Sequence, residues 1–439
     1  MKTFRILILK IVNLLIGMIL IFSSCSSDDL NEMDKQQEEI PEVELKAREN
    51  IILTETGKVI NTQVQGFSFK LMNTLAKEKV NKANYSYSPL GISFALGMAL
   101  NGADKDTYKQ IQKTLGFEGY SNQEINEYML ALQTALPGID NTSTFVNANS
   151  LWGKSKDLFL PNYTSLSQKY YLATVKDNLP FDETTMEEIN AWSNKHTYGM
   201  IPKFFEHANE IKNAEAILLD ALYFKGTWVS KFDKSKTENQ DFKLADGKKI
   251  SVPMMRKEKE IMSCVSNNEV TIVQLPYGNR AFNLYAFLPA DPNQSIDELW
   301  QGMTVEKWNQ WLINGLVRYK TTLSIPRFTT KTNDSELVSI LETMGIKDAF
   351  NSSADFSKMS DTDLFISWVK QMTTIEVEEE GTVVTAISGL GFEITNNGTN
   401  AVEIPTLQVD FNHPFGFILS EVSTGTILFA GKVGNPSVN

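Results

Sequence analysis

Helix-type and strand-type hydrophobic patterns occupy different parts of this chain of 439 residues. In the first third, apolar residues recur at helical spacing, and Val64, Phe67 and Leu71 share one face. Strand patterns dominate afterwards without regular helix alternation, and no linker interrupts the chain after Ile51. This order predicts an α+β fold. The predicted helices cover residues 64–75, 88–99, 104–115 and 122–136, and the predicted strands cover residues 217–224, 270–275, 282–288, 321–325, 364–377, 415–419 and 427–433.

The N-terminus has the pattern of an exported lipoprotein. Lys2, Arg5 and Lys10 precede an apolar run at 11–22, which is short for a membrane span. The small residues that follow lead to Cys25, as in the lipobox of bacterial lipoproteins, where that cysteine is acylated. Residues 1–24 are therefore predicted to be a signal peptide; the alternative is an uncleaved N-terminal anchor.

Residues 25–50 are predicted to form an acidic, flexible tether, because they hold too few apolar groups to repay the entropy of ordering. The Ser-Ser-Asp-Asp stretch after Cys25 resembles the surface-export signal of Bacteroidetes lipoproteins. We expect an outer-membrane lipoprotein that faces the cell exterior, with the periplasmic face as the alternative. The lipid would be its only contact with the membrane.

A search for catalytic and ligand-binding motifs finds none that fits. The net charge of −12 argues against nucleic acid as a partner, because phosphate binding needs clustered Lys and Arg. None of the three histidines has metal-ligand spacing, and HExxH, CxxC, Walker and nucleophile-elbow patterns are missing, so no metal or cofactor is predicted. Ser367 and Lys370 match the SxxK of serine acylases, but that chemistry needs a helix, and these residues lie in the predicted strand 364–377.

Seven segments stand in a recognisable order along the chain: 84–89 (NYSYSP), 190–202 (NAWSNKHTYGMIP), 219–228 (LDALYFKGTW), 326–328 (PRF), 379–382 (EEGT), 411–415 (FNHPF) and 428–433 (LFAGKV). Together they resemble the serpin family. That resemblance implies about nine helices around three β-sheets, with an exposed reactive loop at about 379–410. It also implies the family's mechanism, in which a target protease cuts the loop and is acylated, and the loop then inserts into the main sheet and traps the enzyme. The expected protein is a monomeric suicide inhibitor, not an enzyme.

The resemblance also assigns residues that control insertion. The hinge is expected at Glu379, Glu380, Gly381, Thr382, Val384 and Ala386. Where the sheet opens, Glu379 is expected to pair with Arg327 near Trp228. Under the sheet centre, Ser88 matches the family's shutter, but Asp220 stands where Asn is usual and Gln371 where His is common.

Alternation in the loop itself is compatible with a strand. One face would carry Thr382, Val384, Ala386, Ser388, Leu390, Phe392 and Ile394, which becomes more apolar toward its end. Family spacing from the hinge predicts the scissile bond Thr395–Asn396, with Phe392–Glu393 as second choice. Counting back from Phe411 instead gives a bond near Glu403.

The absence of Lys and Arg between 381 and 410 favours elastase-, subtilisin- or chymotrypsin-like targets, and a cysteine protease stays an alternative. Val384 and Ile387 are bulkier than inhibitory serpins usually have there. They leave open a second interpretation, a non-inhibitory serpin that acts as a surface binding protein.

Overall fold

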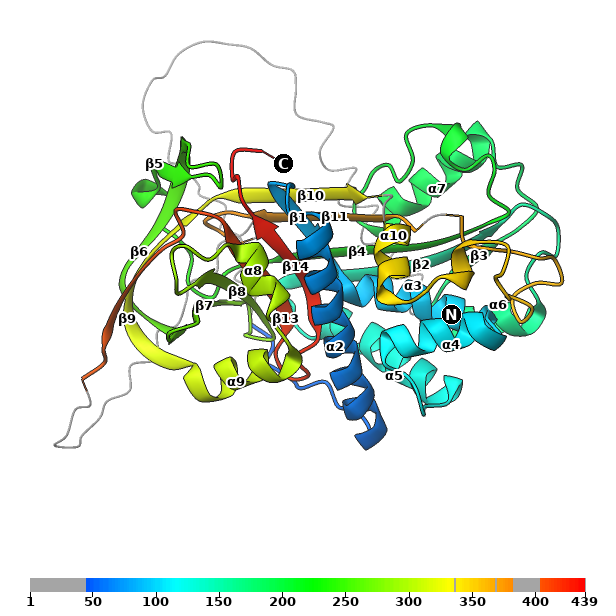
Figure 1. Ribbon diagram of the computed structural model, residues 1–439, viewed down its shortest axis with the longest axis horizontal. Coiled ribbons are helices and arrows are strands. Elements are labelled where there is room, and N and C mark those ends of the chain that lie inside the picture. Colours follow the sequence, from blue (N-terminus) through cyan, green and yellow to red (C-terminus); the bar gives the residue numbers. More distant parts are fainter. Residues whose placement is uncertain (1–44, 335–336, 368, 382–402, 439) are drawn as a thin grey trace, which may run out of the picture. The chain divides into compact units, whose positions relative to one another are not determined.

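The computed structural model describes residues 45–334, 337–367, 369–381 and 403–438 (Figure 1). These residues form nine α-helices and three β-sheets, which confirms the predicted α+β fold. The helices are α2 (Glu55–Glu78), α3 (Pro89–Gly102), α4 (Lys105–Leu115), α5 (Asn122–Ala135), α6 (Pro161–Tyr171), α7 (Glu183–His196), α8 (Ile296–Gln301), α9 (Val305–Gly315) and α10 (Leu337–Met344).

The strands divide into one large and two small sheets. The large sheet has the order β1-β14-β13-β8-β7-β6-β9-β12, with β5 paired to β6. The small sheets are β3-β2-β4 and β10-β11. The strands are β1 (Asn84–Tyr87), β2 (Ser143–Gly153), β3 (Thr174–Lys176), β4 (Ala216–Gly226), β5 (Glu238–Lys243), β6 (Lys249–Ser266), β7 (Val270–Tyr277), β8 (Phe282–Pro289), β9 (Val317–Pro326), β10 (Phe328–Asp334), β11 (Gln371–Val377), β12 (Thr406–Asp410), β13 (Phe415–Glu421) and β14 (Ile427–Val433).

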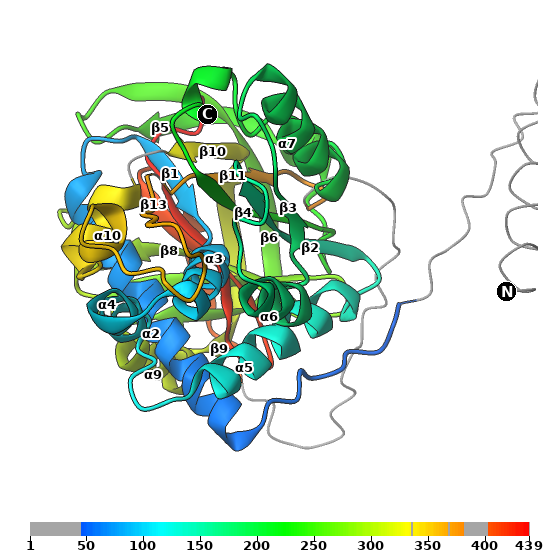
Figure 2. The same cartoon turned by 90° about the vertical axis from the view of Figure 1, so that its right-hand side faces the viewer.

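The two small sheets lie edge to edge, with β4 beside β11 (Figures 1 and 2). Among the described residues no ladder of hydrogen bonds joins these two strands, and an isolated bridge connects Thr227 to Gly381, just after their C-terminal ends. We call this C-terminal end of the two strands the upper end, and the opposite end, near Ala216, the lower end. We call this unpaired boundary between β4 and β11 the seam. Helix α3 covers one face of β4 and α7 covers the other, so the seam lies between two layers of helices.

Helix α3 begins where the sequence predicts, and its start lies under the seam. Ser88 is the N-cap, and its hydroxyl accepts a hydrogen bond from the backbone N–H of Gly91 at 3.0 Å. Pro89 occupies the first turn, where its missing N–H costs nothing. These two residues fix the point at which the chain leaves β1 and enters α3.

The predicted strand 364–377 is wrong in its first half, because β11 begins only at Gln371. The partner strand explains the difference. Strand β10 ends at Asp334, opposite Gln371, and the described residues 364–367, 369 and 370 pair with none of the described strands. They have no regular secondary structure, and the Ile366 N–H donates a hydrogen bond to the carbonyl of Ala349 at 2.8 Å.

Two other expectations concern the ends of the described body. Residues 45–50, assigned to the tether, have no regular secondary structure and are exposed. In the part of the chain that the structure describes, none of the helices combines the length and apolar character needed to cross a bilayer.

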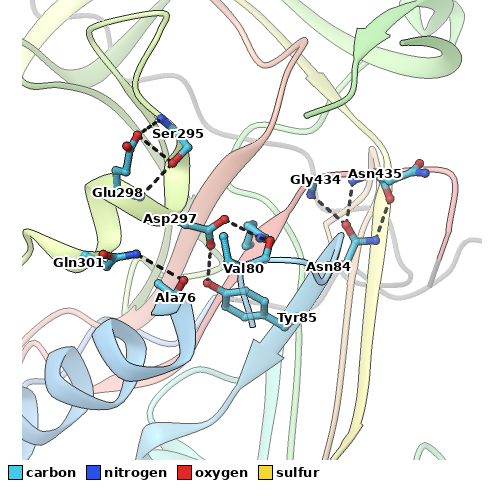
Figure 3. A network of polar contacts seen from close by, with 11 residues as sticks. Ala76, Val80, Asn84, Tyr85, Ser295, Asp297, Glu298, Gln301, Gly434 and Asn435 are labelled. Carbon is cyan, nitrogen blue, oxygen red and sulfur yellow. Dashed lines mark hydrogen bonds and ion pairs between the residues drawn. The ribbon is translucent and has the colours of Figure 1, made fainter. Parts of the chain in front are cut away.

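A buried ion pair ties the large sheet to α8 (Figure 3). Lys432 Nζ of β14 lies 2.7 Å from Asp297 Oδ2, and the side chains are 5% and 9% exposed. The hydroxyl of Tyr85 donates to Asp297 Oδ1 at 3.2 Å. Burial raises the pKa of Asp297, although hydrogen bonding to Lys432 opposes that shift. The pair therefore holds β14 against α8, and the Tyr85 hydrogen bond adds β1, which leads directly into α3.

Asp297→Asn is expected to destabilise the protein by about 3 kcal/mol, because it leaves the Lys432 cation buried without its counter-ion. Thermal unfolding at pH 7 measures the loss, and adding Lys432→Met should recover much of it. The surface pair Lys58–Glu55 at 2.6 Å is the control, since breaking an exposed pair changes stability little. An equal effect at both pairs would contradict this account of the Asp297 pair.

Candidate functional site

The upper end of the seam is closed by a tight turn after β11. Gly381 has φ +116°, and a Cβ there would lie 2.4 Å from the carbonyl oxygen of Gly226 and 2.7 Å from the N of Trp228. Only glycine fits that backbone and that close approach. The Trp228 N–H donates to the carbonyl of Glu380 at 3.1 Å, and the Phe232 N–H donates to that of Glu379 at 2.9 Å. Residues 378–381 are thus fastened to the chain that follows β4.

Glu379 is a buried carboxylate with two strong partners. It is 1% exposed, and Arg327 Nε lies 2.7 and 2.8 Å from its two oxygens, with Nη2 at 2.6 Å. The Thr237 hydroxyl donates to Oε1 at 2.6 Å. Burial opposes ionisation of Glu379, but the hydrogen bonds from Arg327 and Thr237 outweigh it and hold its pKa below the ordinary value. Arg327 and Glu379 are therefore a charged pair that links the loop side of β11 to the end of β9.

Trp228 and Glu380 complete the closure. The Trp228 ring stacks on Tyr277 with centroids 4.1 Å apart, and its Nε1 donates to the carbonyl of Glu378 at 2.8 Å. Glu380 lies 2.8 Å from Lys231 and 3.3 Å from Lys234. Aromatic packing and ion pairs therefore hold the turn from opposite sides.

Arg327→Ala is expected to destabilise the upper end of the seam by about 2 kcal/mol, because the buried Glu379 carboxylate loses its counter-charge. Because the native pKa of Glu379 is lowered, its contribution is present above pH ~4.3 and is lost as pH falls through the native pKa. Thermal unfolding at pH 7 and at pH 3.5 measures the destabilisation by Arg327→Ala and its loss at low pH. Lys234→Ala, which removes an exposed partner of Glu380, is the control. A wild-type melting temperature for Arg327→Ala at pH 7 would contradict the role of the pair.

The middle of the seam carries a second polar contact. The backbone N–H of Ser88 donates to Gln371 Oε1 at 2.8 Å, and Gln371 Nε2 donates to the carbonyl of Ser88 at 3.0 Å. Next to it, Thr373 donates to the carbonyl of Ser86 at 2.8 Å. These bonds attach β11 to β1 and to the start of α3, while β4 takes no part in them.

Asp220 is the exception in this region. It projects from β4 toward α3, is 6% exposed, and neither of its carboxylate oxygens has a hydrogen-bond partner among the described residues. Its side chain and that of Gln371 converge over Gly91, where an added Cβ would lie 2.2 Å from Asp220 Oδ1 and 3.1 Å from Gln371 Nε2. Burial raises the pKa of Asp220 to about 8. The predicted shutter residues are therefore neighbours, but Asp220 is left without a partner.

The lower end of the seam has two features that sequence reasoning missed. Lys370 Nζ lies 2.8 Å from Glu210 Oε2 and 4.9 Å from the centre of the Phe205 ring, so an ion pair bridges the chain before β4 and the start of β11. Beside it is a small apolar pocket with a cavity volume of about 40 Å³. The pocket is lined by Ala95, Leu96, Ala99, Ala216, Ile217, Leu218, Phe356, Met359, Leu364, Phe365, Ile366, Ser367 and Val369.

These placements bear on the other predictions. Ser367 lines the pocket from irregular chain and Lys370 is paired to Glu210, so the arrangement offers no helical Ser–Lys pair. The described residues contain no cluster of His, Cys, Asp and Glu that could hold a metal ion. The remaining predicted site residues lie outside the described residues: Cys25, Thr382, Val384, Ala386, Phe392, Glu393, Thr395 and Asn396.

Comparison with known proteins agrees with this geometry. The family model described as "Serpin (serine protease inhibitor)" matches residues 62–436. Leukocyte elastase inhibitor of Bos taurus is 31% identical over 379 residues, covering 84% of this chain and 97% of that protein, and the Xenopus laevis protein of that name is 32% identical over 383 residues with the same coverage. The crystal structure of a thermophilic serpin, tengpin, in the native state superposes with a TM-score of 0.74 at 27% identity, covering 89% of this chain and 97% of that chain. The chain belongs to the serpin family.

Proposed function

We propose that this serpin is a suicide inhibitor of a protease, working by insertion of its own cut loop into the seam. The target protease attacks the loop at Thr395–Asn396 and becomes attached as an acyl-enzyme. Residues 382–395 then enter between β4 and β11 as a new strand. The protein supplies no catalytic group, since the protease performs the chemistry on itself.

The observation that carries the proposal is the unpaired seam. Over the described residues, β4 and β11 lie side by side without a hydrogen-bond ladder, yet each is paired on its other edge. Unpaired main-chain N–H and C=O groups along facing edges are a template for one more strand. The 378–381 turn stands at the upper end, directly before the segment that would enter.

The target class follows from the loop sequence. No Lys or Arg lies between 381 and 410, so a trypsin-like enzyme, which needs a basic residue before the cut bond, is a poor match. An elastase-, subtilisin- or chymotrypsin-like serine protease suits the loop better, with a cysteine protease as the alternative. The similarity to leukocyte elastase inhibitors supports this choice.

A denaturing gel tests the proposal. The protein is mixed with elastase-like and subtilisin-like proteases, and a band at the summed mass that survives SDS is expected. The same proteases with the catalytic serine replaced by alanine are the control and should give no such band. Cleavage of the loop without a covalent band would contradict inhibition and favour the second candidate, a binding protein, which the bulky Val384 and Ile387 support.

We propose that the protein is a monomeric outer-membrane lipoprotein, anchored through the acylated Cys25. Cys25→Ser is expected to abolish labelling with palmitate and to release the protein from the membrane fraction. The buried Cys264, whose pKa burial raises to about 11, is not available for acylation, so Cys264→Ser is the matched control. Labelling that survives Cys25→Ser would contradict the anchor.

A further inference from the structure

Asp220 lies beside a buried amide on the neighbouring strand. In the antiparallel ladder between β4 and β2, Asp220 pairs directly with Asn149. Such paired residues project to the same face of the sheet, with Cβ atoms about 5 Å apart. Both side chains are buried, and that of Asp220 points toward α3. Their polar ends are therefore within hydrogen-bonding reach of each other.

The hydrogen bonds of Asn149 fix the orientation of its amide. Its Nδ2 donates to the carbonyl of Tyr171 at 2.9 Å and to Gln133 Oε1 at 3.4 Å. A flipped amide would place Oδ1 against these two acceptors, so the nitrogen must stay on that side. The Tyr171 hydroxyl is bound to Asn126 Oδ1 at 2.9 Å and does not serve Asn149. Asn149 Oδ1 is thus left as an acceptor without a donor among the described residues.

Asp220 can supply that donor only as a carboxylic acid. An ionised carboxylate accepts hydrogen bonds but donates none, whereas the neutral acid has one O–H that donates. With Asp220 ionised, its two oxygens and Asn149 Oδ1 would be three buried acceptors that lack a donor among the described residues, which costs free energy. With Asp220 neutral, its O–H satisfies Asn149 Oδ1 and no charge is buried.

The elements packed against Asp220 present no charge to it. Helix α3 and strand β2 contain no ionisable side chain. The ionisable residues of β4 and β11 lie an odd number of positions from Asp220 or Gln371, so they project to the other face of the sheet: Tyr223, Lys225 and Glu376. Burial alone therefore raises the pKa of Asp220, to about 8.

We propose that Asp220 is a neutral carboxylic acid in the native protein and donates a hydrogen bond to Asn149 Oδ1, so that β4 is bonded to β2 through a proton that is released as pH rises. We call this hydrogen bond the proton bond. It lies beside the seam, because β4 forms one edge of the seam. Its loss above pH ~8 leaves a buried charge there, which makes the native state sensitive to pH.

Infrared spectroscopy of the full chain detects the proton directly, because a neutral carboxylic acid has a carbonyl-stretching band distinct from those of carboxylates and amides. The difference spectrum between pH 6.5 and pH 9.5 should contain such a band from Asp220. Asp220→Asn should remove this band. Asn149→Leu should move it to higher frequency, because the acid then loses its hydrogen-bond acceptor.

Asn147→Leu is the matched control. Asn147 lies two residues before Asn149 on the same face of β2, and its amide atoms are also buried without a partner among the described residues. It pairs with Leu222, not with Asp220. The Asp220 band should therefore stay in place in this variant.

An effect of the proton bond on inhibition rests on the proposed function and has its own measurement. The inhibition rates of the parent and of Asp220→Asn are compared at pH 6.5 and pH 9 with one protease, so that the protease's own pH dependence cancels in their ratio. The ratio of parent to variant should rise severalfold with pH, because only the parent gains a buried charge beside the seam.

Each outcome decides one part of the inference. If Asp220→Asn removes no band, Asp220 is ionised at pH 6.5 and the proposal is wrong. If the band moves in Asn147→Leu and not in Asn149→Leu, the proton is present but its acceptor is wrong. An unchanged rate ratio alongside the expected bands would exclude control of inhibition by the proton bond. If the parent forms no covalent complex at either pH, the proposed function fails while the infrared result stands.

Discussion

Thr382→Arg is expected to turn the protein from an inhibitor into a substrate, with the covalent complex reduced at least tenfold while loop cleavage continues. Gly381 forms an antiparallel bridge with Thr227, so a strand that continues from Gly381 into the seam would place Thr382 opposite Gly226. A Cβ at Gly226 would lie 2.8 Å from the Tyr277 ring and 2.9 Å from the Phe224 ring. A guanidinium pressed into that crowded, apolar position would lose its hydration without a counter-ion. Insertion would then be slower than hydrolysis of the acyl-enzyme, so the protease would be released active.

The measurement is the number of inhibitor molecules consumed per protease inactivated, read with the gel of the covalent complex. Thr382→Val is the matched control, because it keeps the β-branched shape without a charge, and it should inhibit nearly as well as the parent. Inhibition by Thr382→Arg at the parent rate would show that the strand does not begin to enter at this residue.

Asp220→Asn is expected to stabilise the native protein by several kcal/mol at pH 8 and by much less at pH 5. The pKa of Asp220 is about 8 in the folded protein, and an unfolded Asp has about 3.9. Between these values the unfolded chain loses the proton while the native chain keeps it, so native stability falls as pH rises from ~4 to ~8. An amide has no such titration, and it can donate where the carboxylate cannot.

Thermal unfolding of both proteins between pH 5 and pH 8.5 measures the effect, and the gap between the two melting temperatures should widen with pH. Asp241→Asn is the control, since Asp241 is exposed on β5 and pairs with Lys249 at 3.1 Å. A gap that stays constant across this range, or that closes with rising pH, would contradict a buried, unpartnered carboxylate in the seam.

The same variant relates stability to function. In the native state the Asp220 carboxylate has no hydrogen-bond partner among the described residues, which raises the free energy of that state. Asp220→Asn removes this unpartnered carboxylate and so lowers the free energy of the native state. Less free energy is then released when the loop inserts. A more stable native protein is therefore expected to be a slower inhibitor.

The sequence predicted those helices and strands whose ends and buried faces depend on a few neighbouring residues. The predicted helix 104–115 matches α4, which begins one residue later and ends at a glycine in the left-handed conformation, Gly116. The runs behind β8, β13 and β14 are mostly apolar without alternation, because both faces of those strands are buried. Strand β6 was missed, because it mixes charged and apolar residues without clean alternation and depends on pairing with β5, β7 and β9.

The candidate site likewise contains some residues that the sequence predicted and some features that it could not predict. The hinge glycine and the acidic residues beside it could be located from a motif, and the positive φ of Gly381 supplies the physical reason for that glycine. The isolation of Asp220, the Glu210–Lys370 pair and the apolar pocket could not be predicted. Each arises only when segments far apart in sequence are brought together, as when Ala95, Leu218 and Phe365 line one pocket.

Cutting the intact protein once between residues 382 and 395 and then recording its melting temperature tests whether the seam accepts the loop. A native state that lacks one strand should gain a ladder of hydrogen bonds along both edges of the seam on cleavage. The melting temperature is then expected to rise by about 10 °C or more. A melting temperature that stays the same or falls after complete cleavage would contradict the metastable native state on which the proposed inhibition depends.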